Sequence, residues 1–210
     1  MASEVADGES HNHEEHFLAT LKGRMTAEKR RLVAFLQELV NETDRGAALV
    51  GAAVLDDRLR ELIATNLVES REASELLEGG NAPLGSFSSR CKMAYCLGLL
   101  TAEEYEDCNT IRRIRNDFAH KLTGLPFQDQ RVKDLCTNLR GYRYYHPFGD
   151  LDTARRRFEK AVLELASVLF YRALISSRFA KPTPDLDSYS KLMFVEEAHD
   201  WATKGEPDGS

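Results

Sequence analysis

Apolar residues recur at intervals of three and four along most of the chain, which is the spacing of one face of an α-helix. No stretch alternates between apolar and polar residues as a half-buried β-strand would. The pattern predicts helices over residues 27–41, 44–68, 71–80, 87–100, 101–122, 131–139 and 153–179. We therefore expect an all-α fold, a compact multi-helix bundle-like single domain.

This predicted helical domain covers residues 23–180 and is flanked by two acidic segments. Residues 1–22 lack helical periodicity, so we expect a disordered acidic tail. Residues 181–210 begin with a proline-containing linker and continue into Ser188–Thr203, a short amphipathic helix that docks on the domain or covers a partner. The apolar positions of this C-terminal helix are Leu192, Phe194, Val195 and Trp201.

The first half of the helix predicted over 44–68 has little side-chain bulk. Its small residues are Gly46, Ala47, Ala48, Gly51, Ala52 and Ala53. Small residues let a second helix approach closely, so this half-helix is the expected centre of packing. Asp44 and Arg45 at its start are the expected ion-pair partners of the basic helix that follows later in the chain.

That basic helix contains Ile111–His120. The pair Thr101 and Glu104 has the form of a capping box at its start. The stripe expected to face the core consists of Ile111, Ile114, Phe118 and Leu122. Arg115 lies at the edge of this stripe, whereas Asn116 and His120 share a second face nearly opposite it. Together the three could hold or cleave a phosphodiester. The alternative is structural, with Arg115 in a salt bridge to an acid such as Asp44.

The net charge is unevenly distributed. The whole chain carries −6, whereas residues 1–20 and 184–210 carry −5 each, which leaves +4 for the middle. This middle region is either a solvated basic face or an anion-binding surface for RNA, DNA or an acidic partner. The candidate binding residues are Arg112, Arg113, Arg143, Arg155, Arg156 and Arg157.

Several classes of protein and site are not indicated. No apolar run is long enough to span a membrane, and the N-terminus has no secretory signal. Cys91, Cys96, Cys108 and Cys136 lack CxxC spacing, so we expect reduced thiols in a cytoplasmic protein. The histidines of the acidic tail (His11, His13 and His16) form at most a weak metal site, and no cofactor motif is present.

Four segments together resemble the MltR family of mannitol operon repressors. They are Glu42-Thr-Asp-Arg-Gly46 with its alanine-rich helix to Leu62, Pro83-Leu-Gly-Ser-Phe-Ser88, Ile111–His120, and Leu135-Cys-Thr-Asn-Leu139. The resemblance covers residues 27–178. It implies a compact helical fold and a role in regulating the transcription of carbohydrate-uptake genes.

Arg115, Asn116 and His120 also resemble the Arg-x4-6-His motif of HEPN domains, which include metal-independent endoribonucleases. That resemblance implies phosphate binding by Arg115, proton transfer by His120, an orienting role for Asn116, and a cleft composed by two subunits. The motif is short and arises readily in a basic helix.

We expect a repressor-type regulator that is not an enzyme and acts through a regulatory protein partner. No pair of short helices has the tight turn and polar second helix of a helix-turn-helix, so nucleic acid would be bound in another way. A homodimer is compatible with the sequence. The alternatives are a HEPN-like ribonuclease that uses Arg115 and His120, and a sensor of a small molecule in the helical cleft.

Overall fold

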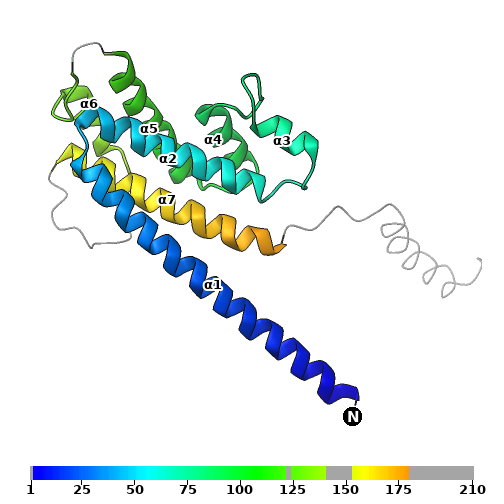
Figure 1. Ribbon diagram of the computed structural model, residues 1–210. Helices are drawn as coiled ribbons and strands as arrows, with labels where there is room; N and C mark the ends of the chain where they lie inside the picture. Colours follow the sequence, from blue (N-terminus) through cyan, green and yellow to red (C-terminus); the bar gives the residue numbers. More distant parts are fainter. Residues whose placement is uncertain (1, 122–123, 141–152, 180–210) are drawn as a thin grey trace, which may run out of the picture.

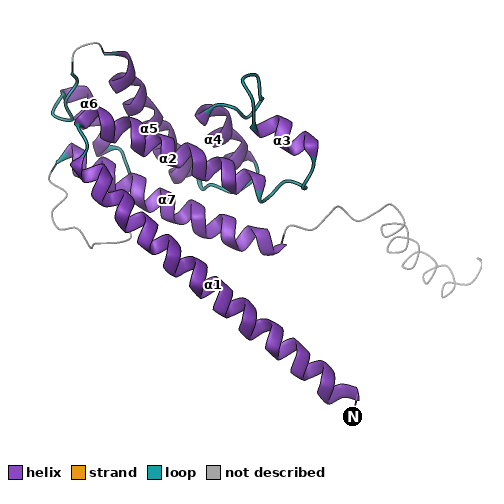
Figure 2. Ribbon diagram, viewed as in Figure 1, coloured by secondary structure: helices purple, strands orange, loops and turns teal. Residues whose placement is uncertain are grey.

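The computed structural model describes residues 2–121, 124–140 and 153–179, and helices are the only regular elements within these ranges. The helices are α1 (Ala2–Asn41), α2 (Asp44–Ala64), α3 (Arg71–Leu77), α4 (Phe87–Cys96), α5 (Ala102–His120), α6 (Gln130–Thr137) and α7 (Ala154–Phe179). The predicted all-α fold is confirmed (Figure 2).

Helix α1 differs most from the sequence prediction. It begins at Ala2, whereas residues 1–22 were expected to be disordered and the helix was expected from residue 27. The segment contains no proline, and its alanine, glutamate, leucine and lysine residues propagate a helix once its packed end has formed. Figure 1 shows that the N-terminal half of α1 extends away from the other helices. Its C-terminal half packs on the body through the buried side chain of Leu39.

Helix α2 is the centre of the fold, as its small residues predicted. It contacts α7, α5 and α4, and Figure 1 shows it running through the middle of the body. A Cβ atom on Gly51 would lie 3.0 Å from Cε1 of Phe158, so glycine allows α7 to approach this closely. Ala47, Ala48 and Ala52 are buried beside it, whereas Ala53 is exposed.

The helix starts follow the capping residues of the sequence. Thr43 accepts a hydrogen bond from the Gly46 N–H at 3.0 Å and caps α2. At α5 the predicted capping box is present. The Glu104 N–H donates to Thr101 Oγ1 at 3.2 Å, and the Thr101 N–H donates to Glu104 Oε2 at 2.8 Å. The predicted C-terminal ends of the helices were less accurate. Helix α2 ends at Ala64 rather than at residue 68, and α4 ends at Cys96 rather than at residue 100.

Aromatic rings join three parts of the core. The ring centroids of Phe118 and Phe127 are 4.9 Å apart, and those of Phe127 and Phe158 are 5.3 Å apart. They connect α5, the segment before α6, and α7. Ile111 and Ile114 are buried on the same stripe of α5 as Phe118, as predicted. This packing fixes which side of α5 remains at the surface.

The thiols are free and most of them are buried. Cys91, Cys108 and Cys136 lie in the core, whereas Cys96 is exposed. Burial raises the pKa of Cys136 to about 12, although the charge of Arg157 opposes this effect. Cys96 is therefore the thiol of this chain that a reagent in solution reaches most easily.

Some predictions fall outside the described residues. They concern Leu122, the candidate binding residue Arg143, and the C-terminal segment 181–210. The side chains of His11, His13 and His16 are likewise outside the described part of the structure. Within the part that is described, none of the helices combines the length and the apolar character needed to cross a membrane.

Candidate functional site

The arginines singled out from the sequence fall into two groups, which make different interactions in the structure. The first group begins with Arg155, in the first turn of α7. Its guanidinium donates to Asp44 Oδ1 and to Glu159 Oε1, each at 2.7 Å. It also donates to the carbonyl oxygens of Leu39, Val40 and Glu42 at the end of α1, at 3.1, 3.2 and 2.6 Å. Arg155 thus joins α7 to both α1 and α2.

Asp44 completes this junction. Its second oxygen, Oδ2, accepts a hydrogen bond from the Phe127 N–H at 2.9 Å. The partner of Asp44 is therefore Arg155, and the alternative that paired it with Arg115 is wrong. The physical reason is that the start of α2 faces the first turn of α7. Burial alone would lower the pKa of Arg155, but its bonds to Glu159 and Asp44 outweigh burial and raise it.

The second group lies on α5 and the start of α2. Arg115 donates to Asn116 Oδ1 at 3.0 Å, and Arg45 donates to the Ala119 carbonyl at 3.2 Å. Arg112, Arg115 and Ala119 are three and four residues apart and share one side of the helix. Arg45 therefore reaches the same side of α5 as Arg112 and Arg115, and we call these three residues the arginine face.

The guanidinium groups of the arginine face form no ion pairs within the described part of the chain. The Nε atom of Arg112 is buried and has no hydrogen-bond partner there. Arg115 is exposed. The arrangement can accept an anionic surface without first breaking an internal salt bridge.

The residues of the HEPN-like motif are only partly brought together. Asn116 holds the Arg115 guanidinium, as an orienting residue would. His120 is exposed at the end of α5, and five residues along a helix turn the side chain about 140° away from Arg115. A single chain therefore does not aim both side chains at one phosphate. Arg113 is also exposed, further round the helix.

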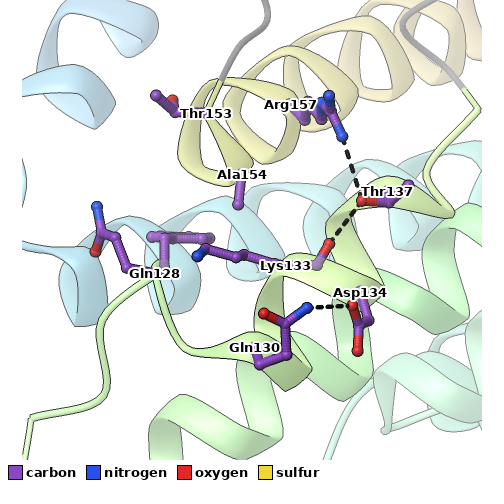
Figure 3. Close-up of a pocket in the computed structure, with 9 residues that line it drawn as sticks. Gln128, Gln130, Lys133, Asp134, Thr137, Thr153, Ala154 and Arg157 are labelled. Carbon is purple, nitrogen blue, oxygen red and sulfur yellow. Dashed lines mark hydrogen bonds between the residues drawn. The ribbon is translucent and has the colours of Figure 1, made fainter.

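Arg157 of α7 borders a cavity of about 370 Å³ between α6 and α7 (Figure 3). Arg157 donates to Thr137 Oγ1 at 3.2 Å, and Gln130 donates to Asp134 Oδ1 at 2.8 Å. Lys133 adds a second cation to the lining. Many of the polar groups of this cavity are therefore already bonded to one another. Arg156 is exposed on the first turn of α7.

Two sets of hydrogen bonds that join parts of the fold were not predicted from the sequence. Asp107, buried on α5, accepts the Arg140 N–H with both carboxylate oxygens, at 2.9 and 3.1 Å. Arg172 of α7 donates to Glu104 Oε1 and to the Leu99 carbonyl, each at 2.9 Å. Asp107 shares the apolar stripe of Ile111, and an acid in such a stripe is a signal that could have been noticed.

The described residues contain no group of three or more His, Cys, Asp or Glu side chains that could hold a metal ion. Arg45 and Arg115 bond only to neutral groups among the described residues, so their positive charge is not neutralised by an internal carboxylate.

The described residues fold into a compact all-α body with no strand. The family model for MtlR, the mannitol repressors, matches residues 36–178. The chain belongs to this family, and the MltR resemblance predicted from the sequence is confirmed.

Two mannitol operon repressors, from Escherichia coli strain K12 and Escherichia coli O6:H1, are each 35% identical to the chain over 60 residues. These residues are 29% of this chain and 31% of each relative, so the match spans less than a third of the length of the relatives. The match supports the family and leaves the activity of the whole protein to be tested.

Among solved structures, the fold is similar to that in the X-ray structure of the MtlR-HPr complex from Escherichia coli. The TM-score is 0.56 at 22% sequence identity, and the similarity covers 68% of this chain and 98% of that one. At this identity the likeness establishes the common fold. The sequence resemblance to HEPN domains has no counterpart in these matches.

Proposed function

We propose that this protein is a repressor-type regulator of carbohydrate-uptake genes of the mannitol type and that it acts through a protein partner. The observation that carries the proposal is the family match across residues 36–178, which spans the whole packed body from the end of α1 to the end of α7.

The packing of α2 supports action through a partner rather than through a helix-turn-helix. The tight connection between α1 and α2 is the best candidate for such a turn in the described residues, but α2 is buried against α5 and α7. A recognition helix must be free to enter the major groove of DNA. Helix α2 could do so only by leaving the core.

A partner of the HPr type is the first to test, because the similar solved structure is a complex of MtlR with HPr. The arginine face is our proposed contact surface for this partner. It is basic, lies on the folded body, and uses none of its three guanidinium groups in internal ion pairs within the described ranges. Such a surface favours an acidic patch on the partner.

The regulatory role is tested in cells that lack their own mannitol repressor and carry a reporter gene behind a mannitol operon promoter. Expression of this protein is expected to lower the reporter signal. The same promoter fragment, mixed with the purified protein, is expected to show no sequence-selective binding. An unchanged reporter would overturn the regulatory role, and tight operator binding by the protein alone would overturn action through a partner.

The contact surface is tested by calorimetry with purified HPr. The double variant Arg112→Glu/Arg115→Glu is expected to bind more weakly than the wild type, and the loss should grow as ionic strength falls. Lys29→Glu is the matched control, since Lys29 is an exposed cation of α1 away from α5. Equal affinity of all three proteins would place the contact elsewhere, while absence of binding by the wild type would exclude HPr as the partner.

A further inference from the structure

The cavity between α6 and the start of α7 is separate from the arginine face, because none of Arg45, Arg112 and Arg115 lines it. Its volume of about 370 Å³ lies in the lower part of the range that is typical of small-molecule sites, about 300–1,000 Å³. A ligand of the size of a monosaccharide fits such a volume, whereas a dinucleotide does not. The size therefore limits the occupant to one small molecule.

Contacts of the folded protein hold the walls of this cavity in place. One wall is Phe127, whose ring packs on those of Phe118 and Phe158 with centroid distances of 4.9 and 5.3 Å. On another side, Arg157 donates to Thr137 Oγ1 at 3.2 Å and joins α7 to α6. The cavity is thus formed before any ligand enters, which lowers the entropy cost of binding.

Two cations line the cavity, one from each helix. Lys133 of α6 precedes Thr137 by four residues, so the two side chains leave the same side of the helix. Arg157 of α7 reaches this side through its bond to Thr137. Within the described ranges the Lys133 ammonium forms no hydrogen bond or ion pair. Its flexible stem allows it to meet an anion that the field of both cations attracts.

The neutral groups of the lining favour a ligand that also carries hydroxyl groups. Figure 3 shows the Lys133 side chain pointing toward Gln128. The Gln128 amide has no hydrogen-bond partner in the part of the chain that the structure describes, and an amide can both donate to and accept from a hydroxyl group. Asp134, the acid of the lining, already accepts a bond from Gln130 at 2.8 Å.

We propose that this cavity binds a small phosphate monoester that carries hydroxyl groups, with Lys133 and Arg157 attracting the phosphate and Gln128 bonding to a hydroxyl group. A phosphate monoester carries a charge of about −1.5 to −2 near pH 7, which suits two cations better than the single charge of a carboxylate. The inference does not rest on the proposed regulatory function, because it concerns a cavity that the arginine face does not line.

The class of ligand is tested by calorimetry at low ionic strength. Glucose 6-phosphate and glycerol 3-phosphate are the probes, and glucose and inorganic phosphate are the comparisons. At least one probe is expected to bind the wild type, inorganic phosphate more weakly, and glucose not measurably. Absence of binding by both probes would overturn the proposal. Equal binding of glucose would overturn the role of the phosphate, and equal binding of inorganic phosphate would overturn the role of the hydroxyl groups.

The location is tested with Lys133→Gln. The variant is expected to bind the probe about tenfold more weakly or worse, because it removes a charged hydrogen bond to the phosphate. Arg156→Gln is the matched control, since it removes the same charge from an exposed residue of α7 that does not line the cavity. Its affinity should stay close to that of the wild type. Equal affinities of all three proteins would place the phosphate elsewhere.

Ala154→Leu tests the cavity itself without changing a charge. Ala154 is in the first turn of α7, and Figure 3 shows its side chain pointing toward that of Lys133. Leucine fills part of the space, so binding of the probe is expected to be lost. The melting temperature without ligand should stay near that of the wild type. Undiminished binding by this variant would place the phosphate on the open surface and overturn the proposal.

Discussion

Arg155 and Arg115 are both arginines in basic helices, yet they occupy different environments. Arg155 is surrounded by two carboxylates and three carbonyl oxygens from α1, α2 and α7. Arg115 is exposed, and among the residues that the structure describes its hydrogen-bond partner is its neighbour Asn116. The side chain of Arg155 has 21% of its surface accessible. The difference is one of position relative to helix ends rather than of residue type.

The contrast separates cations that stabilise the fold from cations that remain available for binding. The end of α1 presents carbonyl oxygens that no further helical turn can use, and Arg155 satisfies three of them. The middle of α5 presents no such groups, because its carbonyls are used within the helix. An arginine there must find a side chain or a partner molecule.

The largest effect on stability is expected from Arg155→Ala. The substitution leaves Asp44, Glu159 and three carbonyl oxygens without their donor, which should cost on the order of 2–3 kcal/mol. For a chain of this size the melting temperature should fall by about 4–10 °C, measured by calorimetry. Arg156→Ala, which removes an exposed neighbour, should change it little. Equal melting temperatures would show that the junction contributes nothing.

A double-mutant cycle sharpens the role of Asp44 at this junction. Asp44→Ala alone should destabilise the protein, because Arg155 loses one partner and the Phe127 N–H loses its acceptor. Arg155→Ala should then cost less in the Asp44→Ala background, with a coupling energy of about 1–2 kcal/mol from urea unfolding. Strictly additive costs would mean that the two residues act separately.

The ion pair between Arg172 and Glu104 provides a pH-dependent test of whether charged contacts between helices stabilise the fold. Burial alone would raise the pKa of Glu104, but bonds from Arg172 and Thr101 outweigh it, and the pKa lies below the ordinary value of 4.5. The stabilisation is therefore present above pH 4.5 and is lost as the pH falls through the lowered pKa. Melting curves of wild type and Glu104→Gln should converge in acid and separate near neutrality. A constant difference at every pH would contradict this.

The smallest effect on stability is expected for the arginine face. Arg115→Ala removes a bond to a neighbouring side chain, and the change in unfolding free energy should stay within about 0.5 kcal/mol. Arg112→Ala should behave in the same way, apart from the packing of its aliphatic stem. A melting temperature lowered as far as in Arg155→Ala would assign this face to the fold and weaken its proposed role in binding.

Much of the fold was predictable because its signals are local. The apolar spacing of α5 identified Ile111, Ile114 and Phe118 as core residues, and Thr101 with Glu104 marked its start. The small residues of α2 indicated the centre of packing, which the contacts of Gly51 bear out. Helix ends were less predictable, because Gly98 and the residues after Ala64 end their helices through local turns that the periodic pattern does not encode.

The candidate site was less predictable than the fold. The sequence placed Arg115 and Arg155 in one set of candidate cations, and only the structure separated them. Asp44 and Arg155 are 111 positions apart, so no spacing rule connects them. Periodicity likewise could not show that α1 continues to Ala2, since a polar helix that leaves the body has no apolar stripe to detect.

By itself, the sequence determined the helices of the packed body, their apolar faces, and the family that the chain resembles, because these depend on neighbours within a few positions. The tertiary structure decided which charged groups meet. It directed Arg155 into the junction of α1, α2 and α7 and left Arg115 exposed at the surface. The physical reason is that ion pairs and exposed patches depend on how helices pack, and packing joins residues that are distant along the chain.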